Sequence, residues 1–180
     1  MAIKSDSYLG ALFGLEGKTI VVTGAGGGIG LAISEGLLRA GAEVAMCNRT
    51  PAKCQPLADK INAEGGTASV HQLDVTSLDS IHACVDEVMA RYGKIDVLFN
   101  VAGVNKREGL LDVEEADYDR IMNTNLKGLF FMSQAVAREM YKRRTGSIIH
   151  WKPDDEVFTD IDVPGSYYKD TLRRQAVVNA

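Results

Sequence analysis

The 180-residue sequence lacks the features that mark membrane and secreted proteins. No apolar run reaches the roughly 18 residues needed to cross a bilayer, and the N-terminal residues 1–8 contain no apolar signal core. Cysteine is scarce, since Cys47, Cys54 and Cys84 form no CxxC motif and have no metal-ligand spacing. These absences predict free thiols in a reducing cytoplasm, no membrane association and no metal site.

An excess of positive charge is lacking as well. The net charge is −4 at pH 7, which argues against nucleic acid as a partner. Apolar residues make up 46% of the chain and charged residues 24%, which is typical of a globular domain rather than of a disordered segment. A length of 180 residues predicts one domain with little room for a separate substrate domain.

Short apolar runs rich in β-branched residues alternate along the chain with helical patterns. This alternation is typical of βαβ units, so we expect an α/β fold, a Rossmann-like doubly wound parallel sheet of about five strands. The expected strands are 19–23, 43–47, 69–73, 95–99 and 146–149. The expected helices are 28–40, 51–64, 77–92 and 114–142, the last one broken near 123–125.

The first expected helix, 28–40, has apolar residues at helical spacing. We expect the face that they form to pack on the sheet. Its members are Ile29, Ala32, Ile33, Gly36, Leu37 and Ala40.

The composition changes near residue 150. Up to residue 149 the alternation is regular, whereas the remainder is polar and partly acidic and contains Pro153 and Pro164. We therefore divide the chain into an N-terminal arm, 1–14, a Rossmann domain, 15–149, and a divergent polar tail, 150–180.

A glycine-rich segment follows the first expected strand and leads into the first helix. Glycines there let the backbone turn sharply and approach a pyrophosphate without an intervening Cβ, and the helix N-terminus offers free N–H groups to the anion. The predicted cofactor-binding residues of this segment are Thr23, Gly24, Gly26, Gly28, Ile29 and Gly30. A glycine loop taken alone is equally compatible with a tight turn between a strand and a helix.

Further segments accompany the glycine loop, which has TGxxxGxG rather than GxGxxG spacing. Leu73-Asp-Val75, Asn100-Val-Ala-Gly103 and Asn123-Thr-Asn125 follow in order, and with them the chain resembles the N-terminal, cofactor-binding half of the short-chain dehydrogenase/reductase family. The resemblance implies hydride transfer between a nicotinamide and an alcohol or carbonyl carbon. It assigns cofactor contacts to Asp74, Val75, Asn100, Ala102 and Gly103, and the active-site asparagine to Asn125.

The residues after the second strand, Asn48 and Arg49, bear on the choice between NADP(H) and NAD(H). A carboxylate there would accept the ribose hydroxyls and repel a 2′-phosphate, whereas a guanidinium suits a phosphate. We therefore expect these two residues to bind the cofactor and to favour NADP(H), with NAD(H) as the alternative. Gly27 carries no basic side chain, and Arg49 is also compatible with a solvated loop residue.

The family's YxxxK pair and catalytic serine have no counterpart in these 180 residues. No tyrosine is followed by lysine four residues later, and Pro153 stands near the serine position. We therefore expect a chain truncated relative to the family's fold, with a non-family tail and impaired catalysis. One alternative is a non-catalytic dinucleotide-binding module. Another is an interaction protein that docks on a full-length relative through an unpaired sheet edge; the chain is also expected to be able to form a homo-oligomer.

Overall fold

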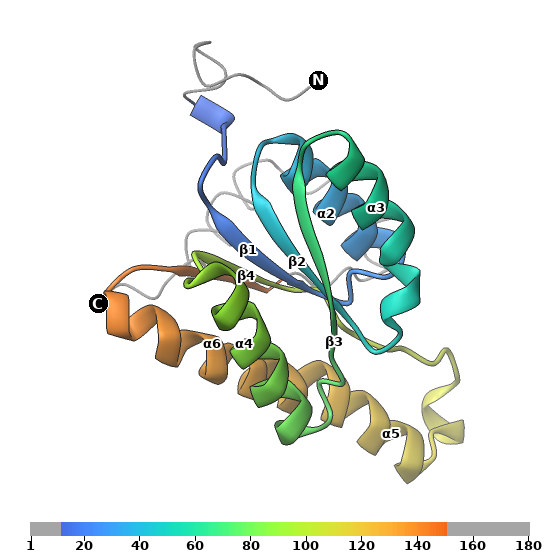
Figure 1. Cartoon of the computed structure of the whole chain (residues 1–180). Helices are drawn as coiled ribbons and strands as arrows, with labels where there is room; N and C mark the ends of the chain where they lie inside the picture. Colours follow the sequence, from blue (N-terminus) through green and yellow to red (C-terminus); the bar gives the residue numbers. More distant parts are fainter. Residues whose placement is uncertain (1–11, 151–180) are drawn as a thin grey trace.

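The computed structural model of the protein describes residues 12–150. Five strands form one fully parallel sheet in the order β3-β2-β1-β4-β5 (Figure 1). They are β1 (Thr19–Thr23), β2 (Glu43–Asn48), β3 (Thr67–Gln72), β4 (Val97–Asn100) and β5 (Ser147–His150). The predicted α/β, Rossmann-like sheet is thereby confirmed, and its strand order reverses between β1 and β4, where open α/β sheets bind ligands.

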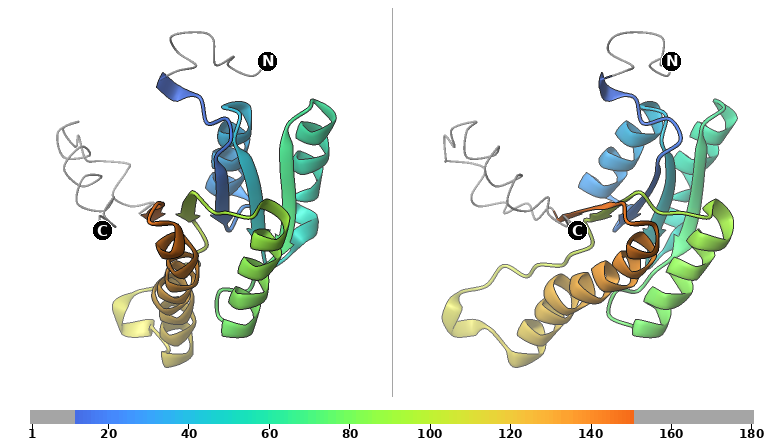
Figure 2. Two further views of the ribbon diagram at one scale, coloured as in Figure 1. Left: turned by 60° about the vertical axis from the view of Figure 1, so that its left-hand side comes forward. Right: turned by 90° about the vertical axis from the view of Figure 1, so that its left-hand side faces the viewer.

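Helices cover both faces of the sheet (Figures 1 and 2). They are α2 (Gly28–Arg39), α3 (Gln55–Ala63), α4 (Leu78–Tyr92), α5 (Glu115–Met122) and α6 (Leu129–Arg143), with short 3₁₀ turns η1 (Pro51–Lys53) and η2 (Leu110–Asp112). The α-helix is interrupted near 123–125 as expected, but the interruption is a π-helical segment, η3 (Asn123–Gly128), so the chain stays helical there. Figure 2 shows α5 and the loop before it projecting away from the sheet.

Alternating strand residues build two separate cores. Val21, Ala45 and Leu98 face α4 and α6. Their neighbours along the strands, such as Ile20 and Val44, face α2 and α3. All five residues of β1 are buried. A central parallel strand covered on both faces requires such a continuous apolar run, and this is why its position was readable from the sequence.

The core-facing side of α2 agrees only in part with the expected one. Ile33 and Leu37 pack against the core as expected, but the fully buried residues are Gly30, Ser34 and Leu38, and Ala32 and Gly36, expected to face the sheet, are exposed. Close packing of the helix start on the glycine loop sets this rotation, because a Cβ at Gly30 would lie 2.2 Å from the carbonyl oxygen of Gly24. The buried hydroxyl of Ser34 does not lack a hydrogen-bond partner, because it donates to the Gly30 carbonyl at 2.8 Å.

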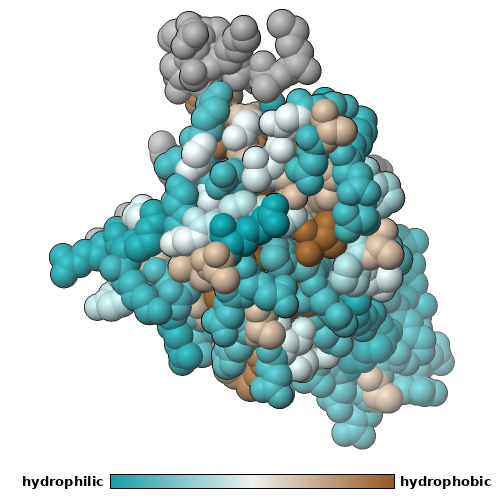
Figure 3. Space-filling model, in the orientation of Figure 1, coloured by the Kyte–Doolittle hydropathy of each residue, from teal (hydrophilic) through white to brown (hydrophobic). Residues whose placement is uncertain are grey.

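The described part of the chain presents a largely hydrophilic surface on the face shown in Figure 3, with apolar side chains scattered among polar ones. No helix within residues 12–150 is long and apolar enough to cross a bilayer. Cys47, Cys54 and Cys84 are buried as free thiols, and the described residues contain no cluster of three potential metal ligands. Most of the expected N-terminal arm and nearly all of the expected polar tail lie outside the described residues.

Candidate functional site

A cavity of about 260 Å³ opens at the carboxyl end of the sheet. Its walls come from the segments that follow β1, β2, β3 and β4, together with Thr124 of η3. Because parallel strands bring their carboxyl ends to one edge, residues 24 and 103 meet there although they are far apart in the sequence. The predicted site residues that line this cavity are Gly24, Gly26, Asn48, Arg49, Asp74, Val75, Ala102 and Gly103.

Gly24, Gly26 and Ala102 line the cavity, and we call them the glycine wall; Gly30 packs directly against the backbone of Gly24. Gly24 has a φ of +68°, and a Cβ on it would lie 2.8 Å from the backbone N and Cα of Ala102. A Cβ on Gly26 would lie 1.9 Å from Nδ2 of Asn48. No side chain therefore fits at these positions, and the backbone itself forms the surface that faces the cavity.

Two buried polar side chains hold the glycine wall in place from behind. Thr23 Oγ1 accepts hydrogen bonds from the backbone N–H groups of Val101 and Ala102 at 3.0 and 3.1 Å, which ties the end of β1 to the segment after β4. Asn100 Nδ2 donates to the Ser133 hydroxyl at 2.9 Å, which ties β4 to α6. Both residues therefore support the cavity without lining it.

Three other predicted contact residues, Gly28, Ile29 and Gly30, are not among those that line the cavity. Gly28, with a φ of +47°, is the first residue of α2, and Ile29 follows it, half-buried. Gly30 packs against the backbone of Gly24. Their direct contact with a ligand stays a prediction, whereas their effect on the position of α2 is visible in the structure.

Three charged residues also line the cavity, Arg49, Lys53 and Asp74, and we call them the charged wall. Arg49 and Lys53 are exposed, and neither forms an ion pair with a carboxylate of residues 12–150. Asn48 Oδ1 accepts from the Thr50 N–H at 3.0 Å, so the turn that carries Arg49 is closed by a local hydrogen bond. Two cations thus border the cavity without a carboxylate partner among the described residues.

Asp74 supplies the negative charge of this wall. Its Oδ1 accepts from the Thr76 hydroxyl at 2.7 Å and from the Thr76 backbone N–H at 2.9 Å. These hydrogen bonds hold the pKa of Asp74 below its usual value, and the charge of Arg49 lowers it further. Asp74 is therefore an ionised acceptor at neutral pH.

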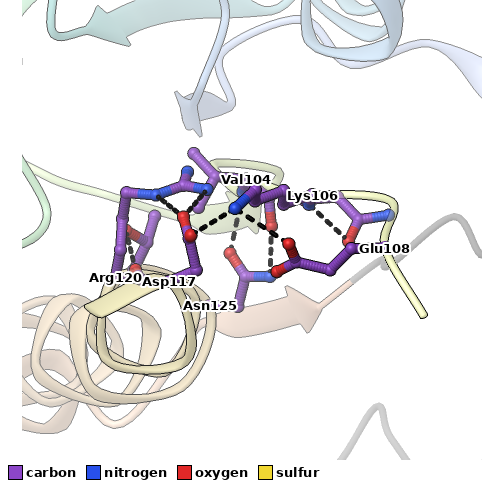
Figure 4. Close-up of polar contacts among 8 residues, drawn as sticks. Val104, Lys106, Glu108, Asp117, Arg120 and Asn125 are labelled. Carbon is purple, nitrogen blue, oxygen red and sulfur yellow. Dashed lines mark hydrogen bonds and ion pairs between the residues drawn. The ribbon is translucent and has the colours of Figure 1, made fainter. Parts of the chain in front are cut away.

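Asn125 lies beside the cavity, in the π-helical segment η3. Its Oδ1 accepts from the Val104 backbone N–H and its Nδ2 donates to the Val104 carbonyl, both at 2.8 Å (Figure 4). At the end of the same segment, Gly128 packs so closely on β3's continuation that a Cβ would lie 2.6 Å from the Val75 carbonyl oxygen. The side-chain amide of Asn125 thus fixes the loop after β4, and its assignment as a catalytic residue stays a prediction.

An ion cluster continues this loop outward (Figure 4). Lys106 Nζ lies 2.8 Å from Glu108 and also pairs with Asp117 of α5, which Arg120 contacts at 3.1 Å. Hydrogen bonds from Lys106 and then Arg120 hold the pKa of Asp117 below its usual value. The cluster joins the loop to α5 at the outer margin of the site.

The sequence analysis did not assign seven residues that line the cavity: Gly27, Thr50, Lys53, Leu73, Thr76, Val104 and Thr124. Lys53 was missed because the 3₁₀ turn η1 folds it back over the glycine loop, and no spacing rule places it there. A search for cations in the turn after the second strand would have found it. Gly27, Leu73 and Thr124 lie within the quoted motifs, whereas Thr50, Thr76 and Val104 have no charge or motif that would have marked them.

Comparison with known proteins matches residues 18–152 to the short chain dehydrogenase family. Gluconate 5-dehydrogenase of Gluconobacter oxydans is 40% identical over 139 residues, which are 77% of this chain and 54% of that protein. The 3-oxoacyl-acyl-carrier-protein reductase FabG of Thermotoga maritima is 37% identical over 136 residues, 76% of this chain and 55% of that protein. The chain thus spans about half the length of the curated relatives it matches.

Solved structures agree with this match. A gluconate 5-dehydrogenase from Burkholderia cenocepacia in complex with NADP and tartrate has a TM-score of 0.72 and 40% identity, over 77% of this chain and 54% of that chain. A short-chain type dehydrogenase/reductase from Mycobacterium marinum has a TM-score of 0.78 and 33% identity, over 86% of this chain and 63% of that chain. With the family match, the shared fold and the glycine wall in agreement, the chain belongs to the short-chain dehydrogenase/reductase family.

Proposed function

We propose that the cavity binds NADP(H) in preference to NAD(H), and that these residues form the dinucleotide-binding half of an oxidoreductase site. The observation that carries the proposal is the glycine wall. Gly24, Gly26 and Gly27 line the cavity without side chains, so a ligand can approach their backbone directly. A tight turn between a strand and a helix does not by itself require three glycines that line one cavity.

The start of α2 suits the pyrophosphate of a dinucleotide. Gly27 is the N-cap of this 12-residue helix and makes no side-chain capping hydrogen bond. The N–H groups of the first turn, together with the positive end of the helix dipole, therefore offer donors to an anion. Gly26 and Gly27 line the cavity at this point, which supports the assignment of the pyrophosphate to it.

The charged wall supports the choice of cofactor. Asp74 is an ionised acceptor suited to the amino group of adenine, and Arg49 is exposed, unpaired within residues 12–150 and suited to a 2′-phosphate. The NADP bound to the Burkholderia cenocepacia enzyme favours the same choice. If Arg49 is only a solvated loop residue, NAD(H) binds as well as NADP(H).

The reaction of the family transfers hydride between the nicotinamide, which supplies or accepts it when bound, and an alcohol or carbonyl carbon. The cavity residues bind and orient the dinucleotide, and the bond pair between Asn125 and Val104 fixes the loop beside it. Because the sequence contains neither YxxxK nor the expected serine, we propose that the 180-residue chain alone binds the cofactor with weak or no turnover. A non-catalytic binding module in the cytoplasm is the second candidate.

Association with another chain is a further part of the proposal. In the described sheet, β5 is paired on one side only, with β4. An unpaired strand edge can add a strand from a second copy or from a full-length relative. Gel filtration separates these states, and a stable monomer that does not associate with such a relative would contradict this part.

Titration of the 180-residue chain with NADPH, and separately with NADH, tests the proposal through the fluorescence of the reduced nicotinamide. We expect both to bind, NADPH more tightly, and a panel of carbonyl substrates to show little or no oxidation of NADPH. Failure of both dinucleotides to bind would contradict the assigned site. Rapid turnover would show that another residue of this chain replaces the missing tyrosine and lysine.

A further inference from the structure

The charged wall contains one cation more than the cofactor motif accounts for. Arg49 and Lys53 both line the cavity and are both exposed, and no carboxylate of residues 12–150 forms an ion pair with either. Other exposed cations of the described residues, such as Lys18 and Lys127, also form no ion pair, so what distinguishes Arg49 and Lys53 is that both line one cavity. Two unpaired cations on one cavity wall favour an anionic ligand of more than one charge.

Lys53 is held over the glycine loop. A Cβ on Gly26 would lie 2.9 Å from Cβ of Lys53 and 1.9 Å from Nδ2 of Asn48, so these two side chains occupy the space that a side chain at position 26 would need. The glycine loop, residues 24–30, contains no charged side chain of its own. Lys53 is therefore the residue that brings a positive charge to the loop from outside.

Asp74 lines the same cavity and adds a negative charge, which the second cation offsets. Asp74 is ionised, and the charge of Arg49 contributes to its lowered pKa, so part of the field of Arg49 is cancelled at the wall. With Arg49 alone, the wall has a formal charge of zero, whereas Lys53 makes it positive. A phosphate monoester carries about −1.5 to −2 charges at pH 7 and is repelled by a carboxylate unless cations outnumber it.

We propose that Lys53 is a specificity-determining residue that, together with Arg49, binds the 2′-phosphate of NADP(H). This inference rests on the proposed function of the cavity. Arg49 supplies a planar guanidinium that can contact two phosphate oxygens, and Lys53 supplies a point charge on a flexible stem. The Thr50 N–H donates to Asn48 Oδ1 and closes the turn between β2 and η1, the turn that carries Arg49 and leads to Lys53.

The test compares adenosine 2′,5′-bisphosphate with adenosine 5′-monophosphate as ligands of the full chain, by calorimetry. Lys53→Gln is expected to weaken binding of the bisphosphate about tenfold, the effect of losing one charge-assisted hydrogen bond, and binding of the monophosphate less than about twofold. Lys53→Arg keeps the charge and is expected to restore bisphosphate affinity to within about threefold.

Lys18→Gln is the matched control. Lys18 is exposed and directly precedes β1, so it lies at the amino end of the sheet, opposite the cavity, and the net-charge change is the same. It is expected to leave both affinities unchanged. Thermal unfolding of each variant shows whether the fold is retained.

Different failures separate this inference from the proposed function. Equal weakening of both ligands by Lys53→Gln, or no change in either, overturns the role of Lys53 while leaving the dinucleotide site intact. Monophosphate binding with no additional affinity for the bisphosphate overturns the phosphate site as a whole. If the unmutated chain binds neither ligand, nor NADPH nor NADH, the proposed function fails together with the inference.

Discussion

The two walls of the cavity are built in opposite ways. The glycine wall consists of backbone, is supported from behind by the buried side chains of Thr23 and Asn100, and leaves no room for a Cβ at Gly24, Gly26 or Gly30. The charged wall consists of exposed side chains whose cations have no ion-pair partner among residues 12–150. The first wall determines whether a cavity exists, and the second determines which ligand it prefers.

This division has an energetic reason. A buried glycine contact is part of the folded core, so a change in the glycine wall alters the free energy of unfolding as well as binding. An exposed unpaired cation contributes little to stability, so a change in the charged wall alters binding alone. Substitutions that violate either expectation would break the comparison.

The largest effect is expected from Gly30→Ala. Its Cβ would lie 2.2 Å from the Gly24 carbonyl oxygen and 2.8 Å from the carbonyl carbon, and backbone atoms of a tight loop cannot move aside easily. We expect a loss of about 3 kcal/mol in the free energy of unfolding, measured by urea denaturation, and loss of NADPH binding.

Gly36→Ala in the same helix is the control for Gly30→Ala. Gly36 is exposed, and a Cβ on it would meet no heavy atom within 4 Å. This substitution is expected to stabilise the protein by about 0.5–1 kcal/mol, because alanine favours a helix interior over glycine. If both variants changed stability in the same direction, packing on the glycine wall would not be the cause of the loss at Gly30.

A smaller effect is expected from Asn125→Ala. The substitution leaves the N–H and the carbonyl of Val104 without the partners that they now have at 2.8 Å. We expect a loss of about 2 kcal/mol in the free energy of unfolding and weaker NADPH binding, since Val104 and Gly103 both line the cavity.

Asn123→Ala provides the control for Asn125→Ala, because Asn123 is an exposed asparagine in the same π-helical segment. We expect it to change the free energy of unfolding by less than about 0.5 kcal/mol. A full loss of NADPH binding with unchanged stability in Asn125→Ala would instead assign Asn125 a direct contact with the ligand.

The glycine wall could be predicted from the sequence, whereas the charged wall could be predicted only in part. Strand periodicity and glycine spacing are local signals, and they correctly predicted the parallel sheet and placed Gly24 and Gly26 at its carboxyl end. Arg49 was found because it directly follows β2. Lys53 was not, because a 3₁₀ turn returns it to the cavity and such turns leave no periodic pattern.

Two other features depend on contacts between distant segments. The apolar pattern of α2 correctly placed Ile33 and Leu37 against the core, but the close approach of Gly30 to Gly24 rotates the helix so that Ser34 is buried and Ala32 is not. The partner of Asn125 is Val104, 21 residues earlier, and only the fold brings them together. Local periodicity carries no information on such contacts.

The smallest effect on stability is expected from Asp117 in the ion cluster beside the site, and this effect depends on pH. The folded-state pKa of Asp117 is lowered, first by the hydrogen bond from Lys106 and then by that from Arg120, relative to an ordinary value of 3.8. A carboxylate with a lowered pKa stabilises the folded state fully above that ordinary value, and this contribution is lost as the pH falls through the folded-state pKa. Asp117→Asn should therefore slightly lower the urea midpoint at pH 7 and reduce the decline of that midpoint below about pH 4, with NADPH affinity at pH 7 unchanged.

Asp119→Asn is the matched control for the same charge change, because Asp119 is an exposed aspartate two residues later in α5. If Asp117→Asn abolished NADPH binding while the urea midpoint stayed constant, the cluster would belong to the binding surface rather than to the outer support of the loop.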